Sequence, residues 1–237
     1  MPAPESSPSR APARLTLFVA SSNPGKLREY RELARSLGGR SFSSDIAAGP
    51  EAGASTPEVS VDLLPDFSTL PHFEESAPTF AENAAGKAMH YSRFAPGIVL
   101  ADDSGLVVPA LGGAPGVRSA RYAGPDASDE DRYRKLLRAM DGKYGAERRA
   151  HFVCVTAIAQ AGRALAVVSD CAHGVLTTAP RGSDGFGYDP IFCFAELGRT
   201  YAELSPEEKN RLSHRGKAFH KLMEFLPLPG RAPQLGM

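Results

Sequence analysis

The chain has 237 residues with 27 basic and 27 acidic side chains, so its formal net charge is zero at pH 7. That length is enough for one large α/β domain or two small lobes around a substantial core. The balanced charge excludes a global field that would attract nucleic acid or an acidic membrane. No apolar run approaches the ~18 residues of a membrane span, and none follows the N-terminal charges as a signal peptide requires. We therefore expect a cytoplasmic protein with no nucleic-acid partner and no membrane partner.

Composition also divides the chain into segments. Residues 1–13 are rich in Pro and Ser and predict a disordered tail, and 229–237 form a second tail. Between them we expect a single α/β domain over 14–228, with a surface insertion at about 43–72. The three cysteines (Cys154, Cys171 and Cys193) are far apart and lack metal-ligand spacing. They are interpreted as small buried thiols in a reducing compartment.

The first predicted strand covers 15–20, and a helix with one apolar face follows over 26–37. The connecting residues are Ser21, Ser22, Asn23, Pro24, Gly25 and Lys26. A loop that enters a helix N-terminus presents unpaired backbone N–H groups and the positive end of a dipole, which suit phosphate, and Lys26 adds a full charge. By itself, this segment favours a capped strand-to-helix turn over a phosphate site.

A Thr79–Glu82 capping box predicts a helix from Phe80 to about Phe94, with Glu74 and Glu75 just before it. A second buried strand over 97–101 is then expected to deliver Asp102 and Asp103 at its end. Carboxylates at such a position commonly hold a hard cation such as Mg²⁺ against phosphate oxygens. A polar turn is the alternative for Asp102 to Gly105.

Further along, a capping box at Ser128 predicts another helix, and the runs 150–159 and 164–169 predict a hairpin. Pro109 makes 106–108 an edge strand or a bend. Residues 181–190 contain three glycines around Phe186 and Tyr188. Such a segment could lay an aromatic ring beside a flat base, and a plain glycine-rich loop with core aromatics is the alternative.

The last predicted helices follow a capping box at Ser205. Lys209 and Arg215 would point to different sides of one ideal helix, so joint contact with one ligand requires a break near Ser213. The Ser213 hydroxyl would then cap a new helix that runs to about Leu226. His214 and Arg215 would lie at its N-terminus, an unfavourable place for a cation unless an anion is bound there.

Six motifs occur in the order typical of one known family. They are Ser-Ser-Asn-Pro-Gly-Lys (21–26), Thr-Phe-Ala-Glu-Asn-Ala (79–84), Ala-Asp-Asp-Ser-Gly-Leu (101–106), Gly-Ala-Pro-Gly-Val-Arg-Ser-Ala-Arg-Tyr-Ala-Gly (113–124), Gly-Phe-Gly-Tyr-Asp-Pro-Ile-Phe (185–192) and Glu-Lys-Asn-Arg-Leu-Ser-His-Arg (208–215). Over about 15–226, the chain resembles the Ham1-like inosine triphosphate pyrophosphatases, which act on noncanonical purine nucleoside triphosphates.

The resemblance implies an elongated, two-lobed α/β fold with a central mixed β-sheet flanked by helices and a nucleotide cleft between the lobes. It also implies a homodimer that uses Mg²⁺ and hydrolyses ITP, dITP and XTP to the monophosphate and pyrophosphate, clearing them from the nucleotide pool. Asp103 would be the catalytic proton acceptor and a metal ligand, with Asp102, Glu74 and Glu75 completing the acidic cluster. Of the two glutamates we favour Glu75.

The same resemblance implies the substrate contacts. These are Ser21, Ser22, Asn23, Pro24, Gly25, Lys26, Ser104, Phe186, Gly187, Tyr188, Asp189, Lys209, His214 and Arg215. Donors from His214 or Arg215 aimed at the 6-oxo group of the base would reject adenine, because ATP would leave them unpaired.

Two other functions stay open at this point. A Maf-type pyrophosphatase shares related chemistry and an acidic cluster but favours pyrimidine or modified nucleotides. A nucleotide-binding regulator without catalysis would keep the phosphate loop and the aromatics, yet it has no need for an acidic pair.

Overall fold

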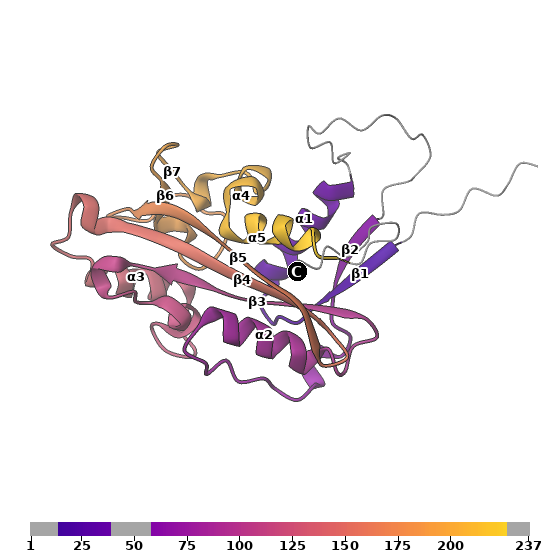
Figure 1. Ribbon diagram of the computed structural model, residues 1–237. Coiled ribbons are helices and arrows are strands. Elements are labelled where there is room, and N and C mark those ends of the chain that lie inside the picture. Colours follow the sequence, from indigo (N-terminus) through magenta and orange to yellow (C-terminus); the bar gives the residue numbers. More distant parts are fainter. Residues whose placement is uncertain (1–13, 39–57, 227–237) are drawn as a thin grey trace, which may run out of the picture.

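A seven-stranded sheet with the order β2-β1-β3-β4-β5-β6-β7 runs through the protein (Figure 1). The computed structural model describes residues 14–38 and 58–226. The strands are β1 (Arg14–Val19), β2 (Glu58–Leu63), β3 (Ile98–Val107), β4 (Arg149–Gln160), β5 (Arg163–Leu176), β6 (Phe192–Phe194) and β7 (Arg199–Thr200). Strand β1 is parallel to β2 and β3, and the other pairs are antiparallel. The predicted mixed sheet and the hairpin of β4 with β5 are therefore confirmed.

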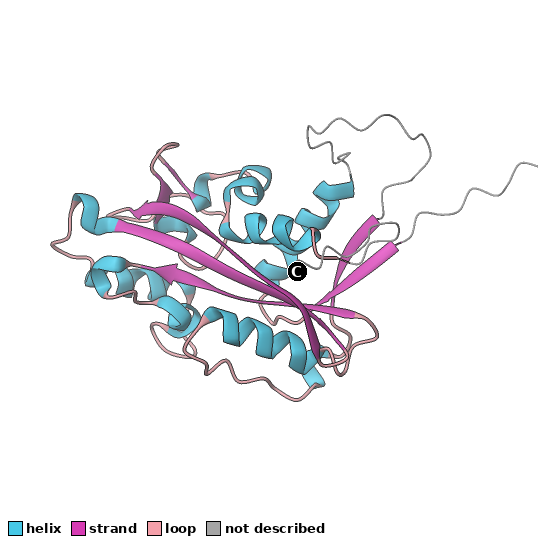
Figure 2. Ribbon diagram, in the orientation of Figure 1, coloured by secondary structure: helices cyan, strands magenta, loops and turns pink. Residues whose placement is uncertain are grey.

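Helices cover both faces of this sheet (Figure 2). They are α1 (Pro24–Gly38), α2 (Phe80–Tyr91), α3 (Asp129–Ala139), α4 (Pro206–Leu212) and α5 (His214–Met223). Helix α2 packs on β3 and β4 from one side, whereas α5 packs on β4 and β5 from the other. The apolar face of α1 (Tyr30, Leu33 and Ala34) is buried with Phe219 of α5, as its helical spacing predicts. Helix α1 also contacts α4.

The predicted break between the last two helices is confirmed. The Ser205 hydroxyl caps α4, and the Ser213 hydroxyl accepts the Gly216 backbone N–H at 3.0 Å to begin α5. A Cβ on Gly216 would lie 1.7 Å from the Asn210 carbonyl oxygen, so the two helices approach too closely for any side chain there. His214 and Arg215 are thereby placed on a different side from the one that a continuous helix would give them.

Two expectations need correction. The strand expected over 97–101 continues to Val107, because residues 102–107 pair in register with β4. Asp102 and Asp103 therefore lie in the middle of a strand and not after it. Part of the expected insertion at 43–72 is also sheet, since β2 pairs with β1 and buries Val61. Residues 43–57 of the expected insertion and both expected tails (1–13 and 229–237) lie outside the described residues. Residues 227–228, at the end of the expected domain, do so as well.

Other details follow the sequence closely. The chain bends after β3, where a short 3₁₀ helix begins at Pro109. Cys154 and Cys193 are buried, Cys171 is half-buried, and all three are free thiols. Within residues 14–38 and 58–226, no helix combines the length and the apolar character that a membrane crossing requires.

Candidate active site

A cavity of about 120 Å³ opens beside the middle of β3. Strand β1 pairs with β3 only as far as Leu100, so residues 101–106 have a neighbouring strand, β4, on one side only among the described strands. Side chains from both faces of the sheet can therefore reach this free edge. The cavity is lined by Asn23, Lys26, Glu75, Asp103, Ser104, Asp129, Arg132, Phe152, Phe186, Gly187, Tyr188, Asp189, Lys209, His214 and Arg215, among others.

Strand geometry separates the two adjacent aspartates. Successive side chains of a strand point to opposite faces. Asp102 points toward α1 and α5, where Lys26 and Arg215 bind its carboxylate at 3.1 and 3.2 Å. Asp103 points toward α2 and accepts a hydrogen bond from Asn83 at 2.9 Å. Asp102 is fully buried and does not line the cavity, so the expectation that it completes one acidic cluster with Asp103 is corrected.

Asp103 and Glu75 are the two carboxylates of the α2 side that line the cavity. Burial raises the pKa of Asp103 to about 6, with the Glu75 charge adding to the rise and the Asn83 hydrogen bond opposing it. Lys87 of α2 pairs with Glu75 and donates to the Asp102 carbonyl oxygen at 2.8 Å. Glu74 is exposed and does not line the cavity, whereas Glu75 does.

The loop after β1 is organised by Asn23. Its side-chain oxygen accepts the backbone N–H groups of Gly25 and Lys26 at 2.8 and 3.2 Å, and the Ser21 hydroxyl accepts that of Asn23. Several N–H groups that were expected to be free for phosphate are thus used within the loop. Ser22 and Pro24 are exposed and Ser21 does not line the cavity. Lys26 and Asn23 are the members of this loop that reach the cavity.

Six charged side chains form a continuous chain of ion pairs behind the cavity. Asp102 joins Lys26 to Arg215, Glu29 of α1 joins Arg215 to Lys209, and Lys209 ends on Asp189. Glu29 contacts Arg215 at 2.5 Å and Lys209 at 2.6 Å. The charges alternate in sign along this series of six ion-paired side chains. Each of its cations that reaches the cavity is therefore held from behind by at least one carboxylate.

Glu29 is a central member of this network that the sequence analysis missed. One weak signal was present: Glu29 lies one helical turn after Lys26 and next to the buried Tyr30. Burial acts to raise the pKa of Glu29, but Arg215 and Lys209 outweigh it and hold that pKa below its ordinary value. Asp102 behaves likewise, since Lys26 and Arg215 overcome its burial and lower its pKa strongly. Both groups are therefore anionic at neutral pH.

His214 is a neutral base at the bottom of the cavity. Burial, followed by the charge of Arg215, lowers the pKa of His214 well below its ordinary value. Its ring stacks on Phe152 with centroids 4.6 Å apart and planes 6° from parallel. The anions that balance Arg215 at this helix N-terminus are Glu29 and Asp102, which corrects the inference that a bound anion is needed there. His214 Nδ1 and Arg215 Nε are buried without a partner among the described residues.

Residues 186–189, called here the aromatic segment, form one wall of the cavity. The Phe186 ring packs so closely on the loop after β1 that a Cβ on Gly25 would lie 2.6 Å from it. The Asp189 carboxylate accepts the Phe186 N–H at 2.8 Å and binds Lys209. Asp189 is thus occupied within the wall. Burial raises its pKa, because the Lys209 charge only partly offsets the loss of solvent.

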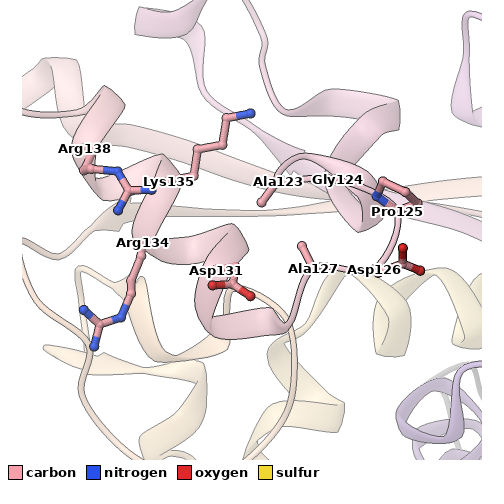
Figure 3. A pocket seen from close by; sticks show the side chains of 9 residues that line it. All are labelled: Ala123, Gly124, Pro125, Asp126, Ala127, Asp131, Arg134, Lys135 and Arg138. Carbon is pink, nitrogen blue, oxygen red and sulfur yellow. The ribbon is translucent and has the colours of Figure 1, made fainter.

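A second, shallower hollow lies against α3 (Figure 3). Asp131, Arg134, Lys135 and Arg138 line it, whereas Asp129 and Arg132 line the cavity beside β3. These two sets lie on opposite sides of a helix with 3.6 residues per turn. Helix α3 therefore separates the hollow from the cavity, and no predicted site residue lies in the hollow.

The described residues contain no group of three or more His, Cys, Asp or Glu side chains arranged to hold a metal ion. Mg²⁺, however, is usually bound by one or two carboxylates together with substrate phosphates and water, and not by a protein cage. Asp103 and Glu75 fit that pattern, because they supply two carboxylates on the same cavity wall. The donor set therefore suits a hard divalent cation that arrives with an anionic ligand.

The fold and the cavity define an α/β protein whose cation-lined site opens at the free edge of a mixed sheet. The chain belongs to the Ham1 family, whose model matches residues 17–225. It is 47% identical over 208 residues to a dITP/XTP pyrophosphatase of Geobacillus kaustophilus, covering 88% of this chain and 92% of that protein. A dITP/XTP pyrophosphatase of Streptococcus agalactiae is 42% identical over 90% of this chain and 60% of its own length. A solved Ham1 protein from Coxiella burnetii superposes with a TM-score of 0.70 at 39% identity, covering 88% of this chain and 96% of that one.

Proposed function

We propose that this protein is a nucleoside triphosphate pyrophosphohydrolase that converts ITP, dITP and XTP to the monophosphate and pyrophosphate. The observation that carries the proposal is the cavity itself, where Asp103 and Glu75 face Lys26, Lys209 and Arg215. Carboxylates opposite cations suit a metal-bound polyphosphate better than either a neutral or a cationic ligand. The relatives named dITP/XTP pyrophosphatase supply the reaction and the substrate class.

The polyphosphate would lie between the Lys26 end of the cavity and the two carboxylates. Lys26 and Lys209 donate to its oxygens and offset the charge that repels an attacking nucleophile. A water molecule attacks the α-phosphorus, and the bond from that phosphorus to the bridging oxygen of the β-phosphate breaks. Pyrophosphate then leaves with the bonding electron pair. Asp103 accepts the proton of the attacking water as the general base.

Asp103 and Glu75 would hold Mg²⁺ in this site. The bound ion would supply charge neutralisation and a lowered pKa for water. The protein itself positions the two carboxylates. Asn83 binds one Asp103 oxygen and leaves the other for the cavity. Lys87, which lies on α2 as Asn83 does, holds Glu75 in place.

The base would be selected by His214 and Arg215. Both line the cavity, and His214 Nδ1 and Arg215 Nε are buried polar atoms without a partner among the described residues. A 6-oxo purine provides an acceptor for the Arg215 Nε–H and, in its Nδ1–H tautomer, for His214, whereas the 6-amino group of adenine does not. Leaving a buried donor unpaired costs about 1–3 kcal/mol, which gives roughly fivefold to 150-fold rejection of ATP per group.

A turnover panel tests the proposal. We expect pyrophosphate release from ITP, dITP and XTP with Mg²⁺, at least about a hundredfold slower release from ATP, dTTP and UTP, and no release in EDTA. Preference for dTTP or UTP would instead indicate Maf-type chemistry. Binding of ITP without pyrophosphate release would indicate a nucleotide-binding regulator. Orthophosphate as the first product would refute attack at the α-phosphorus.

Location and assembly follow from the same function. We place the enzyme in the cytoplasm with the nucleotide pool on which it acts, as a homodimer. Support for self-association comes from the family resemblance and from β5, which exposes Leu165 and Val167 on one face. Light scattering on the eluting peak of a sizing column measures the mass directly, and a value near the 25.2 kDa of one chain would contradict the dimer.

A further inference from the structure

Asp129 connects the two walls of the cavity. Its carboxylate accepts the Gly187 backbone N–H at 2.7 Å, so the first turn of α3 is joined to the aromatic segment 58 residues later in the chain. The same carboxylate binds Arg132 at 2.5 Å through its other oxygen. Both side chains line the cavity, and Arg132 Nε is buried without a partner among the described residues.

The aromatic segment has a second link to the same side. Tyr188 donates its hydroxyl hydrogen bond to the Ser119 carbonyl oxygen at 2.9 Å. Ser119 in turn accepts the Leu106 backbone N–H of β3 through its hydroxyl at 2.9 Å. The wall that carries Phe186 is thus tied to the strand that carries Asp103, and Asp129 supplies the link that is closest to the solvent.

The conformation of Gly187 explains why this link matters. Its φ of +65° and the φ of +81° at Gly185 place two glycines in the left-handed region on either side of Phe186. A backbone with two such residues has many alternative conformations, because glycine loses more freedom on ordering than any other residue. A charge-assisted hydrogen bond to the Gly187 N–H selects one of them. Arg132 keeps the Asp129 carboxylate turned toward that N–H.

We propose that Asp129, oriented by Arg132, is a positioning residue that holds the aromatic segment in its substrate-binding conformation. The idea rests on the proposed function for its kinetic consequence only. Asp129 touches no reacting atom in this scheme. It sets substrate affinity through Gly187, since loss of the link frees the backbone at Gly187 and lets the Phe186 ring leave the cavity wall before the nucleotide arrives.

Glu130 offers a matched control. It lies next to Asp129 in the first turn of α3, carries the same charge and forms an exposed ion pair with Arg134. It does not line the cavity. An effect of Asp129 on the stability of α3 through the helix dipole would therefore be shared by Glu130, whereas an effect through Gly187 would not.

The first test is hydrogen exchange of the free protein, and it does not depend on any activity. Asp129→Ala should speed exchange in the peptide that covers 181–189 by about tenfold, and Glu130→Ala should leave it unchanged. The second test is kinetic, with dITP as substrate. Asp129→Ala should raise KM about tenfold with kcat within about twofold, and Asp129→Asn, which keeps an acceptor oxygen, should recover most of that loss.

The outcomes separate the two ideas. Unchanged exchange at 181–189 in Asp129→Ala, or an equal change in Glu130→Ala, overturns the positioning role. Faster exchange in a protein that hydrolyses no nucleotide leaves the positioning role standing and overturns the proposed function. A fall in kcat with an unchanged KM also overturns the positioning role, because that result would place Asp129 in the chemical step.

Discussion

Replacing Asp103 with Asn should stabilise the metal-free protein and abolish its activity at the same time. Burial and the Glu75 charge raise the pKa of Asp103 from 3.8 to about 6. A carboxyl whose pKa is raised on folding contributes stability below its unfolded pKa, and this contribution is lost as the pH rises through the folded value. The shift of about two units corresponds to roughly 3 kcal/mol at pH 8, of which about half is already lost at pH 5. Asn is neutral and nearly isosteric, so Asp103→Asn avoids this loss.

The assay is urea denaturation in EDTA at several pH values between 5 and 8. The free energy of unfolding of Asp103→Asn should exceed that of the parent by a margin that grows with pH, toward roughly 3 kcal/mol. Addition of Mg²⁺ with a nonhydrolysable nucleotide should then stabilise the parent more than the variant. A margin that is constant or shrinks with rising pH would refute the reasoning, because it would mean that folding does not raise the pKa of Asp103 in the free protein.

Three further changes probe the rest of the site. Glu29→Gln removes the carboxylate shared by two buried cations and should lower the free energy of unfolding, measured in urea, by roughly 3 kcal/mol. The control Glu32→Gln lies on the same helix, and its side chain has only a 3.5 Å contact to an amide. It should change the free energy of unfolding by less than about 0.5 kcal/mol. Equal effects would show that the ion pairs contribute nothing specific. Gly25→Ala places a methyl 2.6 Å from the Phe186 ring, so KM for dITP should rise about tenfold while kcat stays within about twofold; an unchanged KM in steady-state kinetics would mean that the ring position is irrelevant to binding. Ser213→Ala removes the cap of α5 and should lower the midpoint of denaturation by an amount equivalent to about 1 kcal/mol.

The helix starts could be predicted because each depends on residues within one turn. At Ser128, Ser205 and Ser213, a side-chain oxygen accepts a backbone N–H three residues later, and this spacing is visible in the sequence. The break at Ser213 was inferred from function as well, since Lys209 and Arg215 cannot otherwise share a ligand. Local hydrogen bonding and side-chain spacing were sufficient at Ser128 and Ser205.

The end of β3 could not be predicted in the same way. Residues 102–105 are polar or glycine and are typical of a turn, yet the register with β4 keeps them in the strand. Tertiary pairing overrides local preference at this point. As a result, two neighbouring carboxylates that would act together in a loop are sent to opposite faces of the sheet. The role of Glu29 was equally hidden, because its partner Arg215 lies 186 residues away in the chain.

The separation of the two aspartates explains how the site can be both rigid and reactive. Asp102 belongs to a chain of six ion-paired groups whose charges sum to zero, so Lys26, Lys209 and Arg215 stand close together without mutual repulsion. Such a neutral chain attracts a polyphosphate only weakly, however, because every cation in it is already partnered. The net attraction must therefore come from the other face of β3. Asp103 and Glu75 oppose a bare triphosphate, and a divalent cation held by these two residues would offset that repulsion. Such a cation would then determine nucleotide affinity as well as the rate of the chemical step.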